Sequence, residues 1–159
     1  MANQLLTFGG NQPLVDAIVR YGVRFFVMGG SAARFFFPQW QTDDLDLLVE
    51  LTVANGERII GALQSLGCPP IGWTSERLAR RHAQMVLKKE TGTHYNADIL
   101  TPTAEFDFLA HWPLAVDAWV GVTPVKVASA ETVALLMEQS PEARHHQSAQ
   151  KLRRLIRSH

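Results

Sequence analysis

Acidic side chains recur in the segment Thr42–Val49 (Thr-Asp-Asp-Leu-Asp-Leu-Leu-Val), where Asp44 and Asp46 stand two positions apart. On a strand, residues two apart share a face, so both carboxylates should point the same way, while Leu45 and Leu47 point into the opposite layer. Two carboxylates held side by side next to a buried strand repel each other unless a positive charge lies between them. A divalent cation is the obvious candidate, because hard cations such as Mg²⁺ prefer carboxylate oxygens.

A glycine-containing turn precedes this segment. The apolar run Phe25–Met28 predicts a buried strand, the pair Gly29-Gly30 ends it, and Ser31 is expected to cap a short helix over residues 32–35. The free backbone N–H groups and the positive end of such a helix suit a phosphate. Each signal is weak by itself. An ordinary helix-capping turn can have the same residues as the glycine turn, and the solvent-exposed start of an ordinary strand can have the same residues as the Asp-x-Asp pair. Together, at this spacing, the two signals favour a phosphate and metal site.

A third carboxylate, Asp98, lies in the apolar segment Ala97–Leu100. An unpaired carboxylate is costly among apolar neighbours, so Asp98 is the candidate third ligand. The alternative is a surface residue at the end of a strand.

Hydrophobic periodicity predicts both helices and strands. Helices are expected at residues 12–21, 32–35, 54–66 and 129–139, in part of 102–112, and from Pro141 to the end. Strands are expected at residues 23–28, 44–51, 82–89, 95–100, 116–120 and 124–127, with a hairpin turn at Thr91-Gly92-Thr93. The fold class is therefore α/β or α+β, a mixed sheet flanked by helices with a helical C-terminus. We expect one domain over residues 1–159, with a core at about 12–128 and a C-terminal helical segment at about 129–159.

Composition narrows the class of protein. The 159 residues are 47% hydrophobic and 19% charged, which fits a soluble globular protein. The single cysteine, Cys68, excludes an internal disulfide framework and a cysteine-rich zinc site. No apolar run approaches a membrane span, and Met1–Gly10 lacks the pattern of a signal peptide. We therefore expect a cytoplasmic protein without a membrane partner.

The motifs together resemble the nucleotidyltransferase superfamily that includes DNA polymerase β, and most of all its small bacterial branch of minimal nucleotidyltransferases and abortive-infection toxin components. The matching segments are Met28–Ala33, Thr42–Val49 and Ala97–Leu100. In that family the glycine-serine turn holds the triphosphate, two strand aspartates bind the metal ions, and a third aspartate shares one metal and helps to deprotonate the attacking hydroxyl. The resemblance thus implies nucleotide binding by Gly29, Gly30 and Ser31, and metal-binding, catalytic roles for Asp44, Asp46 and Asp98.

The resemblance also implies a reaction. An enzyme of this kind uses Mg²⁺ or Mn²⁺ to move a nucleoside monophosphate from an NTP to a hydroxyl of RNA (a tRNA end), a protein or a small molecule. A role in toxin–antitoxin or defence systems, with a protein antitoxin as partner, follows from the resemblance alone.

Departures from the family pattern support an alternative function. Family members commonly carry an arginine where this chain has residues 39–41 (Gln-Trp-Gln), a lysine where it has Met137, and further charged residues where it has 144–147 (Arg-His-His-Gln). The alternative is a catalytically degenerate relative that binds nucleotide, RNA or another partner. A chance match in an unrelated α/β protein would instead leave no anionic cluster.

The last predicted helix is strongly basic, with no acidic residue after Glu142 although the whole chain has no net charge. Such a helix could steer RNA or a nucleotide toward the site, or it could be an ordinary solvated helix face. Its cations are Arg144, Lys151, Arg153, Arg154 and Arg157.

Overall fold

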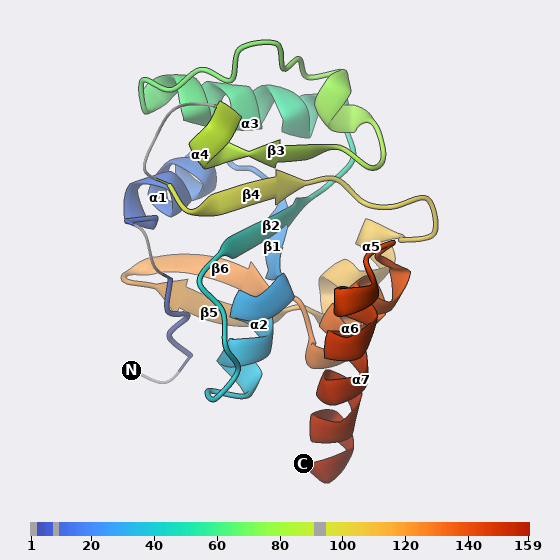
Figure 1. The fold of residues 1–159 in the computed structure, drawn as a ribbon. Helices are drawn as coiled ribbons and strands as arrows, with labels where there is room; N and C mark the ends of the chain where they lie inside the picture. The colour runs from blue at the N-terminus through green and yellow to red at the C-terminus, as the bar shows by residue number, and fades with distance from the viewer. Residues whose placement is uncertain (1–2, 8–9, 91–94) are drawn as a thin grey trace.

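The computed structural model describes residues 3–7, 10–90 and 95–159. Its centre is a six-stranded sheet in the order β3-β4-β2-β1-β6-β5 (Figure 1). The strands are β1 (Phe25–Met28), β2 (Leu45–Val49), β3 (Gln84–Val86), β4 (Ala97–Leu100), β5 (Val116–Val120) and β6 (Thr123–Val127). The helices are α1 (Gln12–Arg20), α2 (Gly29–Phe36), α3 (Val53–Ser65), α4 (Leu87–Glu90), α5 (Phe108–His111), α6 (Ala130–Gln139) and α7 (Ala143–Ser158), with 3-10 turns η1 (Arg77–Ala79) and η2 (Trp112–Leu114).

The sheet is mixed. β1 pairs antiparallel with β2 and parallel with β6, whereas β2 pairs parallel with β4. The two edge strands, β3 and β5, run antiparallel to their neighbours. The predicted class, a mixed sheet flanked by helices with a helical C-terminus, is confirmed.

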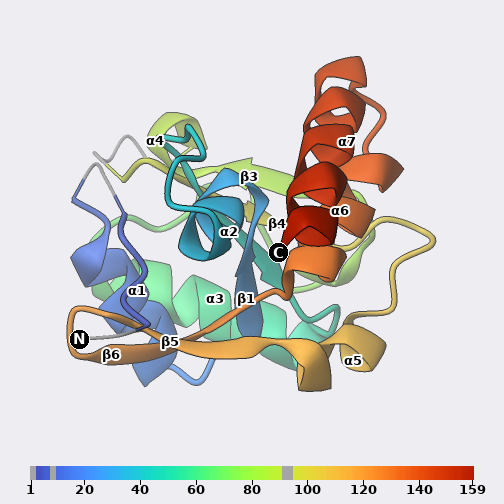
Figure 2. The same ribbon diagram turned by 90° about the horizontal axis from the view of Figure 1, so that it is seen from below.

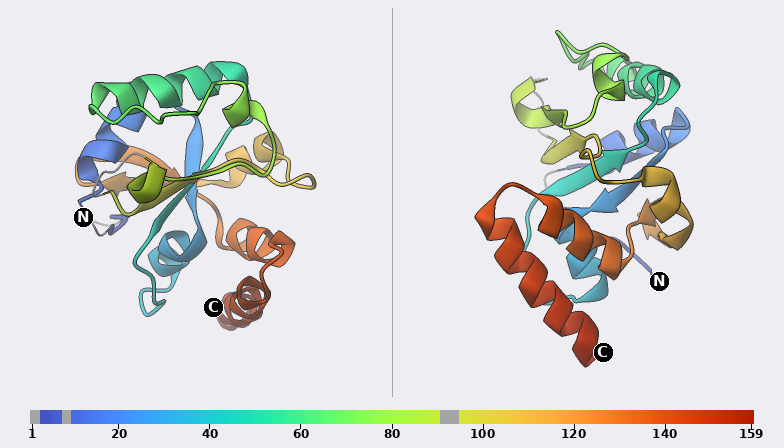
Figure 3. Two further views of the ribbon diagram at one scale, coloured as in Figure 1. Left: turned by 45° about the horizontal axis from the view of Figure 1, so that its top comes forward. Right: turned by 90° about the vertical axis from the view of Figure 1, so that its right-hand side faces the viewer.

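Helices cover both faces of the sheet. α1 and α3 lie on one side, and α2, α6 and α7 lie on the other, as Figure 2 and the left view of Figure 3 show. α6 and α7 pack against each other as an antiparallel pair (Figure 3). None of the helices in the described parts of the chain combines the length and the apolar character needed to cross a bilayer.

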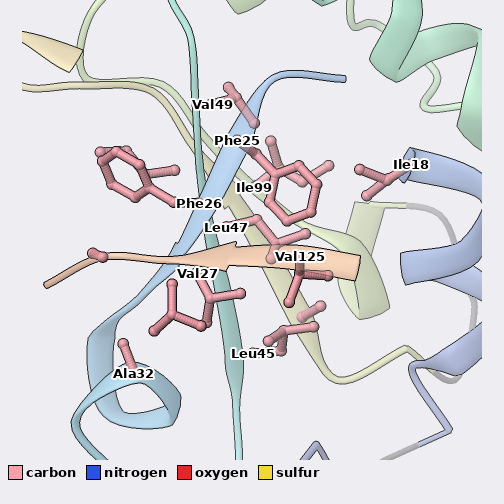
Figure 4. Packing of buried hydrophobic residues seen from close by; sticks show 14 of the residues in the cluster. Ile18, Phe25, Phe26, Val27, Ala32, Leu45, Leu47, Val49, Ile99 and Val125 are labelled. Atoms are coloured by element: carbon pink, nitrogen blue, oxygen red, sulfur yellow. The ribbon is translucent and has the colours of Figure 1, made fainter. Parts of the chain in front are cut away.

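The central strand β1 is apolar because both of its faces are covered. Phe25 lies toward Ile18 of α1, while Phe26 points to the opposite side of the strand (Figure 4). Phe26 is fully buried and stacks on Phe108 at a centroid distance of 4.8 Å. A strand buried on both faces reads as a continuous apolar run, which is why periodicity located it.

One predicted strand is shorter in the structure than the sequence suggested. The strand expected at residues 82–89 covers only Gln84–Val86, and the chain continues as the short helix α4. The Lys-Lys-Glu run that follows Leu87 explains this, since these residues favour helix and are depleted in strands. The antiparallel pairing of this strand with β4 is confirmed, whereas the expected turn at 91–93 lies outside the described residues.

Candidate functional site

Asp46 and Asp98 lie side by side in the sheet. The parallel register of β2 and β4 pairs Asp46 with Asp98, and the antiparallel register of β1 and β2 pairs Met28 with Asp46. Neighbouring strands lie about 4.8 Å apart, and residues paired across them point to the same face. That face is the one covered by α2, α6 and α7, because Leu45, Leu47 and Ile99 fill the other.

Asp44 precedes β2 and is more exposed. The strand begins at Leu45, one residue later than predicted. Asp44 lies one pleat before Asp46 on the same face, and its backbone carbonyl accepts a hydrogen bond from the Ser31 hydroxyl. Asn96, just before β4, hydrogen-bonds the Asp44 carboxylate and also donates to the carbonyl of Asp43. The start of β2 is thus fixed from both sides.

Burial, and then the charges of neighbouring carboxylates, raise the pKa values of Asp44, Asp46 and Asp98. Burial, then the charges of Asp98 and Asp44, raise the pKa of Asp46 from 3.8 to about 7, and Arg144 acts in the opposite direction. Burial and the charge of Asp44 also raise the pKa of Asp98, against a hydrogen bond from Gln84 that lowers it. Clustered carboxylates with raised pKa values are a common property of cation-binding and catalytic sites.

The glycine turn closes over Asp46. Gly29 has a φ of +66°, and a Cβ at this position would collide with Oδ2 of Asp46. A Cβ on Gly30 would come to 2.5 Å from Oγ1 of Thr42. Only glycine therefore lets the first turn of α2 approach both the carboxylate and the segment that leads to it. The N-terminus of α2, with its free N–H groups, consequently lies beside Asp46.

Ser31 has a different local role from the one predicted. Met28, not Ser31, occupies the N-cap position of α2, which already begins at Gly29. The Ser31 side chain is buried and its hydroxyl donates to the carbonyl of Asp44. The expectation of a Ser31 cap was therefore wrong, because the helix begins two residues before Ser31 and its N-cap carries no side-chain hydrogen bond. The hydroxyl tethers β2 to α2, and the backbone N–H of Ser31 lies in the first turn of α2, where N–H groups have no partner within the helix.

Three polar residues at the site were not assigned to it from the sequence. Gln84 of β3 donates from Nε2 to Oδ2 of Asp98 at 3.0 Å, and Asn96 contacts Asp44. Arg144, at the start of α7, is close enough to lower the pKa values of both Asp44 and Asp46. The pairing of β3 with β4 was predicted, but no sequence pattern set its register and hence the place of Gln84. The sequence identified Arg144 only as one of the cations of a basic helix.

The three aspartates do not form a preassembled three-ligand centre. Within residues 3–7, 10–90 and 95–159, no group of three or more His, Cys, Asp or Glu side chains could hold a metal ion as it is arranged. The donors nevertheless suit a hard cation, because the register-paired carboxylates of Asp46 and Asp98 repel each other and offer only oxygen. Binding would require the exposed Asp44 carboxylate to turn toward this pair.

Two surface hollows are not lined by the aspartates, although one of them reaches Ser31. One, of about 190 Å³, is lined by α1, β6 and Trp112. The other, of about 160 Å³, is bounded by Ser31, Arg34 and the N-terminal segment. Neither includes Asp44, Asp46 or Asp98 among its lining residues.

No family model, curated protein or solved structure matches this chain. The resemblance to nucleotidyltransferases therefore remains a prediction carried by the motifs quoted above.

Proposed function

We propose that the chain is a divalent-cation-dependent nucleotidyltransferase. The observation that carries the proposal is the register pair Asp46–Asp98 beside the glycine-started helix α2, which brings paired carboxylates and free N–H groups together. A carboxylate pair can bind a divalent cation, and a helix N-terminus beside it can bind the phosphates that accompany the cation.

Asp46 and Asp98, with Asp44, would hold Mg²⁺ or Mn²⁺. Such ions, when bound, neutralise phosphate oxygens and make an attacking hydroxyl more acidic. The N–H groups of Gly29, Gly30 and Ser31 would bind the oxygens of the triphosphate, assisted by the positive end of α2. Arg144 supplies a further positive charge on the same face of the sheet.

Asp98 is the proposed proton acceptor. Gln84 occupies its Oδ2, so Oδ1 is the oxygen left to take the proton of the acceptor hydroxyl. The deprotonated oxygen then forms a bond to the α-phosphorus of the NTP while the bond to the bridging oxygen breaks. Pyrophosphate leaves with the electron pair of that bond, and the nucleoside monophosphate stays on the acceptor.

Calorimetry with each NTP tests the proposal, with and without Mg²⁺, on the wild type and on Asp44→Ala/Asp46→Ala. We expect binding that needs Mg²⁺ and disappears in the double variant. Asp107→Ala/Asp117→Ala, which removes two carboxylates remote from the site along the chain, should bind as the wild type does. Nucleotide binding that does not depend on Mg²⁺ and is unchanged in the Asp44→Ala/Asp46→Ala variant would refute the proposal.

A second function has an observation in its favour. Because the three carboxylates are not preassembled for a metal, a non-catalytic nucleotide- or RNA-binding protein is the alternative. It predicts binding without transfer of the nucleotide to any acceptor. Participation in a toxin–antitoxin or defence system, an antitoxin partner and a cytoplasmic location remain predictions of the resemblance and composition.

A further inference from the structure

Basic side chains are concentrated on α7, which carries no acidic side chain. The chain holds 15 basic and 15 acidic side chains, and α7 contains five of the former and none of the latter. The remainder of the protein therefore carries a formal net charge of −5 with histidine neutral. A positive helix on a negative protein attracts polyanions to one place rather than to the whole surface.

The cations of α7 lie on its exposed side. Ala149 and Leu152 are buried against the body of the protein, and Arg153 forms an ion pair with Glu138 of α6 at 2.8 Å. The other basic side chains of the helix are exposed, and one of them, Arg144, also forms an ion pair with Glu142 at 2.6 Å. These exposed residues are Arg144, Lys151, Arg154 and Arg157. Between the first and the last the helix rises by about 20 Å, at about 1.5 Å per residue. We call these four residues the α7 cation row.

The α7 cation row begins at the candidate site. Arg144, in the first turn, acts electrostatically on Asp44 and Asp46. Two turns later, Nζ of Lys151 lies 4.8 Å from the centre of the Trp40 ring. Trp40 is buried in the segment that leads directly into Asp44, so α7 lies beside that segment. α7 lies on the side of the sheet that α6 also covers (Figure 3). The row therefore follows this helix from Arg144, which acts on the aspartates, to Arg157.

We propose that the α7 cation row binds the phosphates of a single-stranded polynucleotide and leads its hydroxyl-bearing end to the aspartates. The proposal rests on the proposed nucleotidyl transfer, for which it names the acceptor class. A polynucleotide offers both regularly spaced negative charges and a terminal hydroxyl, which is the group that such a reaction needs.

An acidic protein segment fits the surface less well. Protein interfaces depend on apolar anchors buried at their centre. Among the described residues, the large apolar side chains that are clearly exposed lie on other elements, for example Ile71, Leu114 and Val122, and none lies on α7. A surface of cations without apolar anchors is typical of phosphate-backbone contacts.

Fluorescence anisotropy with a labelled single-stranded RNA of about 12 nucleotides tests the proposal over a range of salt concentrations. The variant is Lys151→Gln/Arg154→Gln/Arg157→Gln, which leaves Arg144 in place. Each lost phosphate contact lowers the slope of log K against log salt by about 0.7 for a single strand, so we expect the magnitude of the slope to fall by about 2.

A matched variant removes the same charge elsewhere. Arg20, Arg58 and Arg80 are exposed on α1, on α3 and just after η1, the turn that packs on α3. Replacing these three by glutamine should leave the salt slope close to that of the wild type. NTP binding by calorimetry should be the same in both triple variants, which separates this proposal from the preceding one.

Three results would overturn the proposal. The first is no RNA binding by the wild type at low salt. The second is an equal loss of slope in both triple variants, which would mean that any surface cation serves. The third is binding of polyglutamate but not of RNA, which would assign the row to an acidic protein partner. RNA binding without NTP binding would instead support RNA binding by the α7 cation row and contradict the proposed nucleotidyl transfer.

Discussion

Replacing Asp46 by asparagine should stabilise the protein, in the absence of divalent cations, by an amount that grows with pH. The pKa of Asp46 is raised from 3.8 to about 7 by burial and by the charges of Asp98 and Asp44. Because the folded protein holds this proton more tightly than the unfolded chain, the carboxylate costs no stability below about pH 4. The cost develops as the pH rises from about 4 to about 7 and is complete above the folded-state pKa. A difference of about three pKa units corresponds to about 4 kcal/mol.

Urea unfolding of wild type and Asp46→Asn at pH values from about 4 to about 8, with a chelator present, measures the effect. The free energy of unfolding of the variant minus that of the wild type should increase by about 4 kcal/mol across this range. Glu57→Gln, which makes the same carboxylate-to-amide change at an exposed position of α3, should show no such increase. A difference between Asp46→Asn and wild type that does not change with pH would mean that the pKa of Asp46 is not raised in the folded protein.

Three further changes have defined outcomes. Gly29→Ala should destabilise the protein by about 1–3 kcal/mol in urea unfolding and by more than Gly67→Ala, because both positions have positive φ but only Gly29 meets a carboxylate. Ser31→Ala should cost about 1–3 kcal/mol in the same assay, since a backbone carbonyl loses its donor. Arg144→Ala should raise the pKa of Asp46 further, which carboxyl NMR signals followed against pH would report.

Each of these predictions has an outcome that contradicts it. Equal costs for Gly29→Ala and Gly67→Ala would mean that backbone strain alone matters at the turn. An unchanged stability for Ser31→Ala would mean that the hydrogen bond between Ser31 and the Asp44 carbonyl does not stabilise the fold. An unchanged pKa of Asp46 in Arg144→Ala would mean that Arg144 does not act electrostatically on Asp46.

Local patterns were enough to predict the strands of the core. Phe25–Met28 and, apart from Asp46, Leu45–Val49 are apolar because helices cover both faces of the sheet, and Gly29 and Asp44 mark their ends. The same patterns allowed Asp46 and Asp98 to be selected as residues of one site. Their pairing then followed from the parallel register of β2 and β4.

Long-range register was beyond the reach of these patterns. The contact of Gln84 with Asp98 depends on how β3 slides along β4, and residues 82–89 carry no alternation that fixes it. The approach of Arg144 to Asp44 depends on the packing of α7 against α6, which no local spacing encodes. The role of Ser31 was missed for another reason, since a serine after two glycines is equally typical of a cap.

Binding of Mn²⁺, followed by electron paramagnetic resonance of the free ion, tests whether Asp46 and Asp98 belong to a cation site that accepts a nucleotide. We expect the wild type to bind Mn²⁺ in the presence of an NTP, and we expect Asp46→Asn and Asp98→Asn each to weaken this binding strongly, whereas Asp117→Asn should not. Mn²⁺ binding that is equally strong in all four proteins, or absent from the wild type, would contradict the assignment of these aspartates to a nucleotidyl-transfer site.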